Sequence, residues 1–429
     1  MVKITAEIRT KFPNIIVVWG GTHATICPEE CIRHVDYVCI GEGELSFIEF
    51  VKNVQSSSNL DNINNFWIKK KADNTEIITK NKISNFLENL DEIPIFDYSS
   101  QNKYYIEDNK LFEGDPILNL SKYCIMVSRG CPFRCSFCSN SYFHQLFKDK
   151  GKFVRRRSID HVFLELAYAK RTLKNMKVIS FLDEVFVFDQ QWVREFVREY
   201  KKKINLDFRC EFYPSLVDEE IVCLLKDAGL KEVTMGIQSG SERIRNEIFN
   251  RSTPDTQILR AAKIFKKYKI TPHYDIILDN PYETWDDMQE GIKLLLQIPR
   301  PYNFHLYSLI NFPKTDLTQK LIKDGFCNNH NAKKALSQWR MSLNSERNKE
   351  HLYHNCLVSL LSKRFIPKIA IEFLLKNKFL LKHPKIVIIV TSFANKSKLV
   401  FTGISMILTG KVSYNMFKHY LHDFKELIN

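Results

Sequence analysis

The feature of this sequence that most restricts its fold is a repeated alternation of short strand-like runs with longer helical patterns between Ser121 and Ile310. Six of the runs fit strands: Tyr123–Ser128, Val178–Asp183, Phe208–Tyr213, Glu232–Ile237, His273–Leu278 and Phe304–Ile310. Helices fit between them, one of them over Ser241–Phe249, and Ser158 and Gly229 are well placed to cap two others. Alternation of this kind predicts an α/β fold with a parallel sheet and helices outside it. Six such units predict an open, partial (β/α)6 TIM-like barrel.

The 429 residues leave room for further domains on both sides of this barrel, which we place at residues 116–325. Residues 1–55 hold an amphipathic helix, two short strands and a second helix, and we expect a separate α/β segment there. Residues 56–115 fit a connector with one small hairpin. Residues 326–429 are basic and mostly helical, with one helix expected over residues 414–425, and we expect a helical C-terminal region that caps the barrel. A substrate lid or a membrane-surface contact remains the alternative for these helices.

The residues with the most specific chemistry follow the first predicted strand. Cys131, Cys135 and Cys138 form a CxxxCxxC loop. Three thiolates that close together can hold an iron–sulfur cluster or a soft metal, and they leave one coordination position without a nearby protein ligand. In barrels the chemistry gathers at the carboxyl ends of the strands, so the fold places this loop where a site is expected.

A structural zinc site is the main alternative, but zinc usually takes four protein ligands. Cys124 and His144 are the nearest candidates for a fourth ligand. Cys124 lies in an apolar run, which favours a buried structural cysteine, and His144 follows two aromatic residues against which it could pack. The eleven cysteines are mostly scattered and do not form a disulfide framework. We therefore expect a reducing, cytoplasmic location.

The cysteine loop, with the aromatic Phe137 just before its last cysteine, resembles the motif of the radical S-adenosylmethionine (SAM) superfamily. The resemblance implies that Cys131, Cys135 and Cys138 hold a 4Fe–4S cluster. It also implies that SAM binds to the free iron and is cleaved reductively to a 5′-deoxyadenosyl radical. A reduced flavodoxin or ferredoxin-type protein would be the electron donor.

Two segments in the first half of the barrel resemble the superfamily's SAM-binding segments. Phe137 resembles the residue near the SAM adenine, although it could also shield the cluster. Asp183 and Glu184 resemble the acidic segment that receives the SAM amino group. Neighbouring residues of a strand point to opposite faces, so only one of the two carboxylates can face the barrel lumen. The sequence leaves open which one does.

Two later strand ends extend the resemblance. Gln238 and Ser239 resemble residues that bind the SAM ribose, and Ile277 resembles a residue that touches the adenine. Arg243 could pair with the SAM carboxylate as a fork, or it could equally make a surface ion pair.

Residues 1–55 resemble the last part of a cobalamin-binding Rossmann-like domain, as found ahead of the barrel in one branch of the superfamily. The Gly20-Gly21 turn would let the backbone approach the nucleotide tail of cobalamin, with His23 beside it. The earlier strands of such a domain, including the loop that carries DxHxxG, have no counterpart in the sequence. We therefore expect an N-terminally truncated domain, from a fragment or a late-start gene model, that binds cobalamin weakly or not at all.

The resemblance as a whole implies an enzyme that cleaves SAM to start methylation, cyclisation or rearrangement of a small-molecule or lipid-like substrate. A non-catalytic iron–sulfur protein or inactive fragment is the alternative. An RNA-modifying enzyme is a further one, because the net charge is +14. Nucleic acid is disfavoured as a partner, since no RNA-binding appendage is recognisable. The charge also fits peripheral contact with a membrane.

Overall fold

The computed structural model describes residues 1–72, 75–99, 101–327 and 348–391. The chain divides into two compact units. The described part of the first unit comprises residues 1–234, 246–252 and 310–327, apart from the gaps just given. The described part of the second comprises residues 235–245, 253–309 and 348–391.

The sheet that the repeated alternation predicts is present, and it confirms the fold class. Its strands are β7 (Lys122–Ile125), β10 (Val178–Phe181), β11 (Asp207–Phe212), β12 (Leu230–Gln238), β13 (Thr271–Leu278) and β14 (Asn303–Ser308). Their order is β14-β13-β12-β11-β10-β7. In the first unit β7, β10 and β11 pair in parallel, and in the second β13 and β14 do so. Strands that follow the chain order in this way form the sheet of an open barrel.

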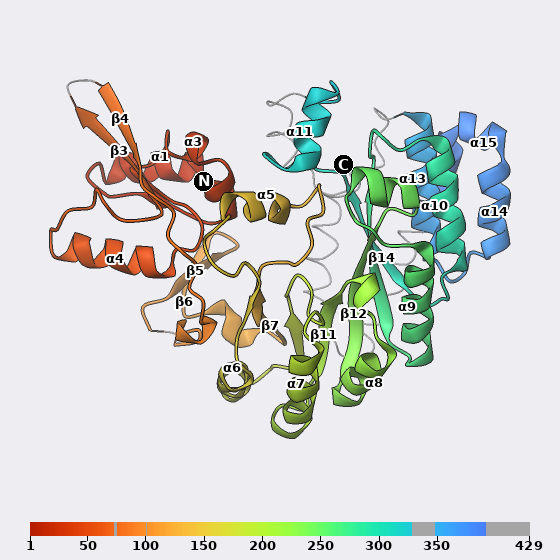
Figure 1. Ribbon diagram of the computed structural model, residues 1–429, viewed down its shortest axis with the longest axis horizontal. Helices are drawn as coiled ribbons and strands as arrows, with labels where there is room; N and C mark the ends of the chain where they lie inside the picture. Colours follow the sequence, from red (N-terminus) through yellow and green to blue (C-terminus); the bar gives the residue numbers. More distant parts are fainter. Residues whose placement is uncertain (73–74, 100, 328–347, 392–429) are drawn as a thin grey trace. The chain divides into compact units, whose positions relative to one another are not determined.

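Helices lie between these strands, as predicted. In the first unit they are α5 (Ser139–Leu146), α6 (Ile159–Thr172), α7 (Gln190–Lys203) and α8 (Glu219–Ala228), with α11 (Asp316–Lys323) after the sheet. Figure 1 shows α6, α7 and α8 along one face of the strands of this unit. Both predicted caps are present: the Ser158 hydroxyl accepts the His161 backbone N–H, and Gly229 has a φ of 117°.

The second unit carries α9 (Asp255–Lys267), α10 (Trp285–Gln297), α13 (Lys349–Leu361), α14 (Lys368–Lys376) and α15 (Lys378–Lys382). The helix expected over Ser241–Phe249 is a single π-helical turn, Ile244–Ile248. The predicted helix over residues 414–425 lies outside the described residues. Within the described ranges, no helix is both long and apolar enough to cross a membrane.

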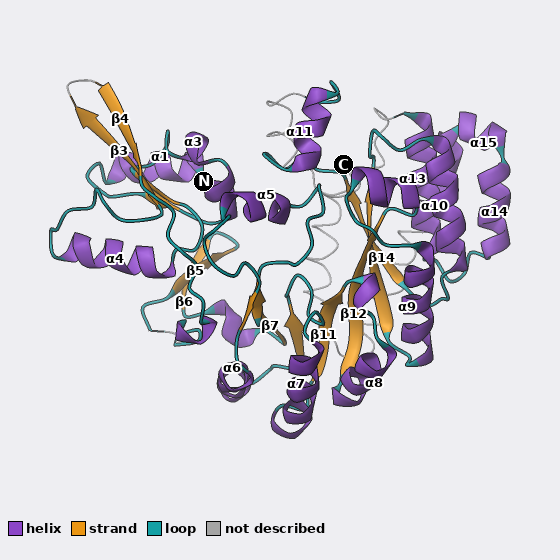
Figure 2. Cartoon of the chain, in the orientation of Figure 1, coloured by secondary structure: helices purple, strands orange, loops and turns teal. Residues whose placement is uncertain are grey.

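The N-terminal residues build a second sheet in the first unit, with strand order β1-β2-β3-β4. Its strands are β1 (Val18–Trp19), β2 (Tyr37–Cys39), β3 (Phe66–Ala72) and β4 (Thr75–Lys80), and the nearby helices are α1 (Val2–Lys11), α2 (Thr22–Ile26), α3 (Pro28–Cys31) and α4 (Glu44–Gln55). β1 and β2 are parallel. β3 and β4 form an antiparallel hairpin (Figure 2), and β3 pairs with β2, also antiparallel. The hairpin expected in the connector therefore extends the sheet of residues 1–55; its turn at residues 73–74 lies outside the described residues.

Four short strands complete the first unit. They are β5 (Tyr104–Glu107), β6 (Lys110–Glu113), β8 (Ser128–Arg129) and β9 (Arg155–Arg156). β5 pairs with β6, and β8 pairs with β9, both antiparallel. The β8–β9 pair lies at the base of the cysteine loop, because β8 ends one residue before Gly130.

Candidate functional site

The cysteine loop connects β8 to α5 in the first unit. Gly130 opens it with a φ of 80°, and a Cβ atom there would lie 2.3 Å from the carbonyl oxygen of Phe153. Only glycine fits this position without a shift of the backbone. Cys138 occupies the N-cap position of α5. All three cysteines are free thiols; Cys135 is buried, and Cys131 and Cys138 are half-buried.

Each of the three sulfur atoms has an N–H donor nearby. The donors are the backbone N–H of Phe133 for Cys131, the Arg251 guanidinium (3.5 Å) for Cys135, and both the backbone N–H and the side-chain amide (3.7 Å) of Asn140 for Cys138. N–H donors stabilise negative charge on sulfur and tune a metal centre that the sulfur binds. The loop therefore fits an anionic, cluster-ligating state of its cysteines.

The protein around the loop makes bare thiolates unfavourable. Burial raises the pKa of Cys131 to about 12 and that of Cys138 to about 11. A bound iron atom would replace the proton and supply the positive charge that a buried thiolate needs. The donor set thus fits a 4Fe–4S cluster in its ligand chemistry and its charge.

A short segment braces the loop from the side. The Ser136 backbone N–H donates to the carbonyl of Phe249 (2.9 Å), and the Ser136 hydroxyl donates to the carbonyl of Ile248 (2.5 Å). Phe137 packs edge-on against the Phe249 ring, with 5.0 Å between ring centroids. Phe137 is half-buried beside the thiols, which fits the shielding role; its contact with adenine stays a prediction.

Neither candidate for a fourth zinc ligand points at the thiols. His144 Nε2 lies 2.9 Å from the Cys131 carbonyl oxygen, and its ring packs on Phe153. Cys124, expected to be buried, is exposed, because in β7 it points away from the side that buries Tyr123 and Ile125. Among the described residues, no three His, Cys, Asp or Glu side chains converge on one metal ion. A cluster distributes its cysteine ligands over different iron atoms, so it needs less convergence than zinc does.

The two carboxylates after β10 point to different surroundings. Asp183 is fully buried and accepts hydrogen bonds from the Val127 backbone N–H (3.0 Å) and the Ser128 hydroxyl. Glu184 hydrogen-bonds to Asn140, and its charge raises the pKa of the Cys131 and Cys138 thiols. Glu184 reaches solvent, yet the surrounding protein still raises its own pKa through burial. Glu184 is therefore the carboxylate beside the cysteine loop, and Asp183 holds the backbone that leads into it.

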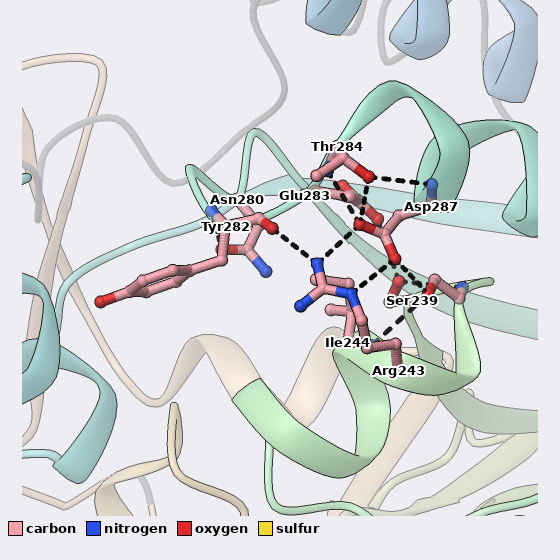
Figure 3. A network of polar contacts seen from close by, with 9 residues as sticks. Ser239, Arg243, Ile244, Asn280, Tyr282, Glu283, Thr284 and Asp287 are labelled. Atoms are coloured by element: carbon pink, nitrogen blue, oxygen red, sulfur yellow. Dashed lines mark hydrogen bonds and ion pairs between the residues drawn. The ribbon is translucent and has the colours of Figure 1, made fainter.

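In the second unit, a polar network joins the ends of β12 and β13 (Figure 3). Arg243 Nε lies 3.0 Å from Asp287 Oδ1. Arg243 Nη2 lies 2.6 Å from Asp287 Oδ2 and 2.8 Å from the Tyr282 carbonyl oxygen. Asp287 also closes a capping box with Thr284 at the start of α10. These contacts hold the pKa of the Asp287 carboxyl well below its usual range, although burial alone would raise it. The Arg243 fork thus makes an ion pair within the protein, the second of the two roles open to it from sequence.

The neighbouring predicted SAM contacts differ in accessibility. Ser239 is buried, and its hydroxyl donates to Glu283 Oε1 (3.0 Å). Gln238 is half-buried at the end of β12, with a positive φ of 70°. Ile277 lies on β13 and is only 9% exposed. Of the two residues expected to bind ribose, Gln238 is the accessible one.

Two features of the second unit were not predicted from the sequence. The first is Arg245, fully buried, which donates to the carbonyls of Ser239 and Gly240 (both 2.9 Å) and of Thr253 (2.9 Å) and so fixes the loop after β12. The sequence offered no signal for it, since the partners are mostly main-chain atoms.

The second is an aspartate–histidine pair on adjacent strands. His305 Nδ1 lies 2.9 Å from Asp275 Oδ1, and the rings of His305 and His273 lie 5.0 Å apart. Asp275 and His305 are register partners in β13 and β14, and both remain partly exposed. Such a pair can accept or donate a proton. The sequence signal that could have indicated this pair is the alternation along β13 of the polar His273 and Asp275 with the buried Tyr274 and Ile276.

The N-terminal sheet of the first unit contains a cavity of about 440 Å³. Its lining is largely glycine and small side chains: Val18, Gly20, Gly21, Cys39, Gly41, Gly43, Glu44 and Phe47. A Cβ at Gly21, where φ is 88°, would meet no atom within 4 Å. Gly20 and Gly21 both line the cavity, whereas His23 is exposed on α2 and is not part of the lining.

Ion pairs connect this cavity to the cysteine loop. Arg129, next to Gly130, lies 2.5 Å from Glu44, which lines the cavity. Arg155, its register partner in β9, contacts Glu42 at 2.5 Å and 2.9 Å as a fork. The Gly41–Glu44 turn is therefore fixed to the strands that carry the cysteine loop.

Comparison with known proteins finds matches both for the barrel that carries the cysteine loop and for the N-terminal residues that form the cavity. Residues 125–295 match the Radical SAM superfamily, and residues 1–51 match the B12 binding domain. An uncharacterized methyltransferase of Pyrococcus horikoshii is 29% identical over 67% of this chain and 59% of its own length. The anaerobic magnesium-protoporphyrin IX monomethyl ester cyclase of Rubrivivax gelatinosus is 26% identical over 72% of this chain and 54% of its own length.

Among solved structures, the cobalamin-dependent SAM radical enzyme OxsB, with aqua-cobalamin and SAM bound, has a similar fold. Its TM-score is 0.63 at 15% identity, and the match covers 98% of this chain and 73% of OxsB. The chain spans little more than half the length of the two curated relatives named above. By these matches, residues 125–295 form a radical SAM domain and residues 1–51 match a B12 binding domain, and the chain has a fold similar to that of OxsB.

Proposed function

We propose that this chain is a radical SAM enzyme whose Cys131, Cys135 and Cys138 hold the 4Fe–4S cluster. One observation supports this assignment above others: all three thiols of the loop between β8 and α5 are free, and each has its own N–H donor. When bound, the cluster supplies the electron that cleaves SAM to methionine and a 5′-deoxyadenosyl radical. The protein's part is to hold SAM in place and to shield the site.

We assign Glu184 as the acceptor for the ammonium group of SAM, because it is the carboxylate beside the thiols, whereas Asp183 is engaged with main-chain N–H groups. Phe137 covers the cluster side of the loop. Of the strand-end residues of the second unit, Gln238 is favoured over the buried Ser239 for contact with ribose. Ile277 keeps its sequence-based assignment to adenine. The Arg243 fork is engaged by Asp287, so its contact with the SAM carboxylate stays a prediction from the sequence.

We also propose that the N-terminal cavity receives part of a cobalamin tail. Its glycine lining leaves room for a ligand close to the backbone, and the residues that form it fall within the B12 binding match. Equilibrium dialysis against hydroxocobalamin tests this proposal. We expect weak binding, which Gly43→Val should reduce by filling the cavity; equal binding by the variant contradicts the assignment.

The overall reaction is proposed as methylation or cyclisation of a small molecule in the cytoplasm, with a flavodoxin or ferredoxin-type protein as reductant. The names of the two curated relatives, a methyltransferase and a cyclase, support these two reactions equally. The Asp275–His305 pair offers a group for proton transfer with such a substrate.

Anaerobic incubation of the cluster-loaded, reduced protein with SAM tests the enzymatic proposal. The expected products are 5′-deoxyadenosine and methionine, even without substrate, and omission of the reductant is the control. A fully loaded and reduced cluster that yields no 5′-deoxyadenosine would instead support a non-catalytic iron–sulfur protein.

A further inference from the structure

The C-terminal helices of the second unit form two layers. In α13, every residue from Leu352 to Leu361 is buried. It packs against α10 on one side and against α14 and α15 on others (Figure 1). The Tyr353 hydroxyl donates to the Leu374 carbonyl (2.6 Å), which ties α13 to α14. α14 and α15 thus have an inner face on α13 and an outer face away from it.

The outer face is more apolar than a solvent-facing surface requires. In α14, Ile371 and Leu375 point inward and are buried. Ile369 and Phe373, one helical turn apart on the opposite face, are 74% and 65% exposed. Other large apolar residues in residues 365–390 are also exposed: Phe365, Phe379, Ile386, Ile389 and Val390. Aromatic and branched side chains exposed together in so short a segment indicate a binding surface.

The charged residues of the same segment are nearly all basic. Residues 363–391 contain seven Lys or Arg residues and one acidic residue, Glu372. Arg364, Lys376, Lys378, Lys382 and Lys385 are exposed, interleaved with the apolar residues. In the described part of the chain, none of these five makes an ion pair with a carboxylate.

We propose that α14, α15 and the helical residues 384–391 bind the surface of an anionic membrane. Helices with exposed Phe and Ile beside lysines lie in the plane of a membrane interface, where the apolar side chains insert and the lysines meet lipid phosphates. Protein–protein interfaces are, by contrast, depleted in lysine. The contact proposed is peripheral, with the helices lying along the membrane interface.

Vesicle co-sedimentation tests this proposal with the full chain and does not depend on SAM chemistry. We expect binding to vesicles of phosphatidylcholine with phosphatidylglycerol, and at least about tenfold weaker binding to phosphatidylcholine alone. Raising the salt concentration should weaken the binding. The double variant Ile369→Ser/Phe373→Ser should lose about tenfold in affinity through lost insertion. Lys378→Gln/Lys382→Gln should lose affinity for the anionic vesicles only.

A matched control is Ile106→Ser/Leu111→Ser, which removes two apolar side chains of 75% and 69% exposure from the β5–β6 hairpin. This control should bind vesicles as the unchanged protein does. Equal binding of the Ile369→Ser/Phe373→Ser variant, or absence of binding to anionic vesicles, overturns the proposal. A protein dimer in solution that only the α14 variant abolishes also overturns it, in favour of a second copy as the occupant.

Discussion

Arg243 and Asp287 form a two-point ion pair, in which Arg243 Nε lies 3.0 Å from Asp287 Oδ1 and Arg243 Nη2 lies 2.6 Å from Asp287 Oδ2. The pair joins the loop after β12, whose sequence resembles a SAM-binding segment, to the first turn of α10. Asp287 is almost fully buried, while Arg243 remains 38% exposed. The Arg243 guanidinium therefore holds the loop after β12 and the first turn of α10 in position.

A double-mutant cycle measures this pair. Because Arg243 is partly exposed, we expect a coupling energy of about 1–2 kcal/mol between Arg243→Ala and Asp287→Ala, from urea unfolding. Arg243→Lys should recover only part of it, since lysine lacks the fork. A coupling near zero would show that the pair contributes nothing to stability.

Glu283 should make the protein's stability depend on pH. Burial raises its pKa from the usual value to about 8, so the folded protein keeps a proton that the unfolded chain releases near pH 4.5. Its contribution is therefore fully present below about pH 4.5 and is lost as pH rises towards 8. Glu283→Gln keeps an acceptor for Ser239 and should flatten this decline. Thermal unfolding of both proteins from pH 5 to 9 measures this decline. If the melting temperature of Glu283→Gln falls with pH as steeply as that of the unchanged protein, Glu283 is not the group responsible.

Gly130→Ala tests the turn that opens the cysteine loop. The added methyl group would overlap the Phe153 carbonyl, at a φ that alanine rarely adopts. We expect the variant to fold but to hold less iron after anaerobic reconstitution, because the turn positions Cys131. Gly325→Ala is the matched control: it also has a positive φ, but its Cβ meets open space. Equal iron content in all three proteins would show that the loop does not depend on this turn.

The two carboxylates after β10 should behave differently towards SAM. Glu184→Gln should weaken SAM binding by the cluster-loaded protein about tenfold, through loss of a charge-assisted hydrogen bond. Asp183→Asn should mainly lower stability, because it disturbs the bonds to Val127 and Ser128. Equilibrium dialysis with SAM and thermal unfolding separate the effects. The reverse pattern would assign the ammonium contact to Asp183.

Elements that depend on nearby residues could be predicted from the sequence. The six strands, the Ser158 cap and the Gly229 stop follow from local patterns, and all are present. Alternation predicted that Asp183 and Glu184 point to different surroundings, as they do, but it could not tell which of them lies beside the cysteine loop, because β10 ends at Phe181, before both residues. Cys124 was misplaced because an apolar run does not tell which face of an edge strand is covered.

Contacts between distant residues could not be predicted. Arg243 meets Asp287 only because β12 and α10 come together in the fold, and Arg129 meets Glu44 across 85 residues of sequence. The expected hairpin over β3 and β4 formed, yet its pairing with β2 depends on a register that the local pattern does not encode.

The most direct test of the central claim is the iron and sulfide content of the anaerobically reconstituted protein. We predict one 4Fe–4S cluster per chain, with its broad visible absorption, and loss of both iron and absorption in the triple variant Cys131→Ala/Cys135→Ala/Cys138→Ala. The control variant Cys124→Ala should load as the unchanged protein does. A triple variant that still assembles the cluster, or zinc in place of iron in the anaerobically purified protein, would contradict the account.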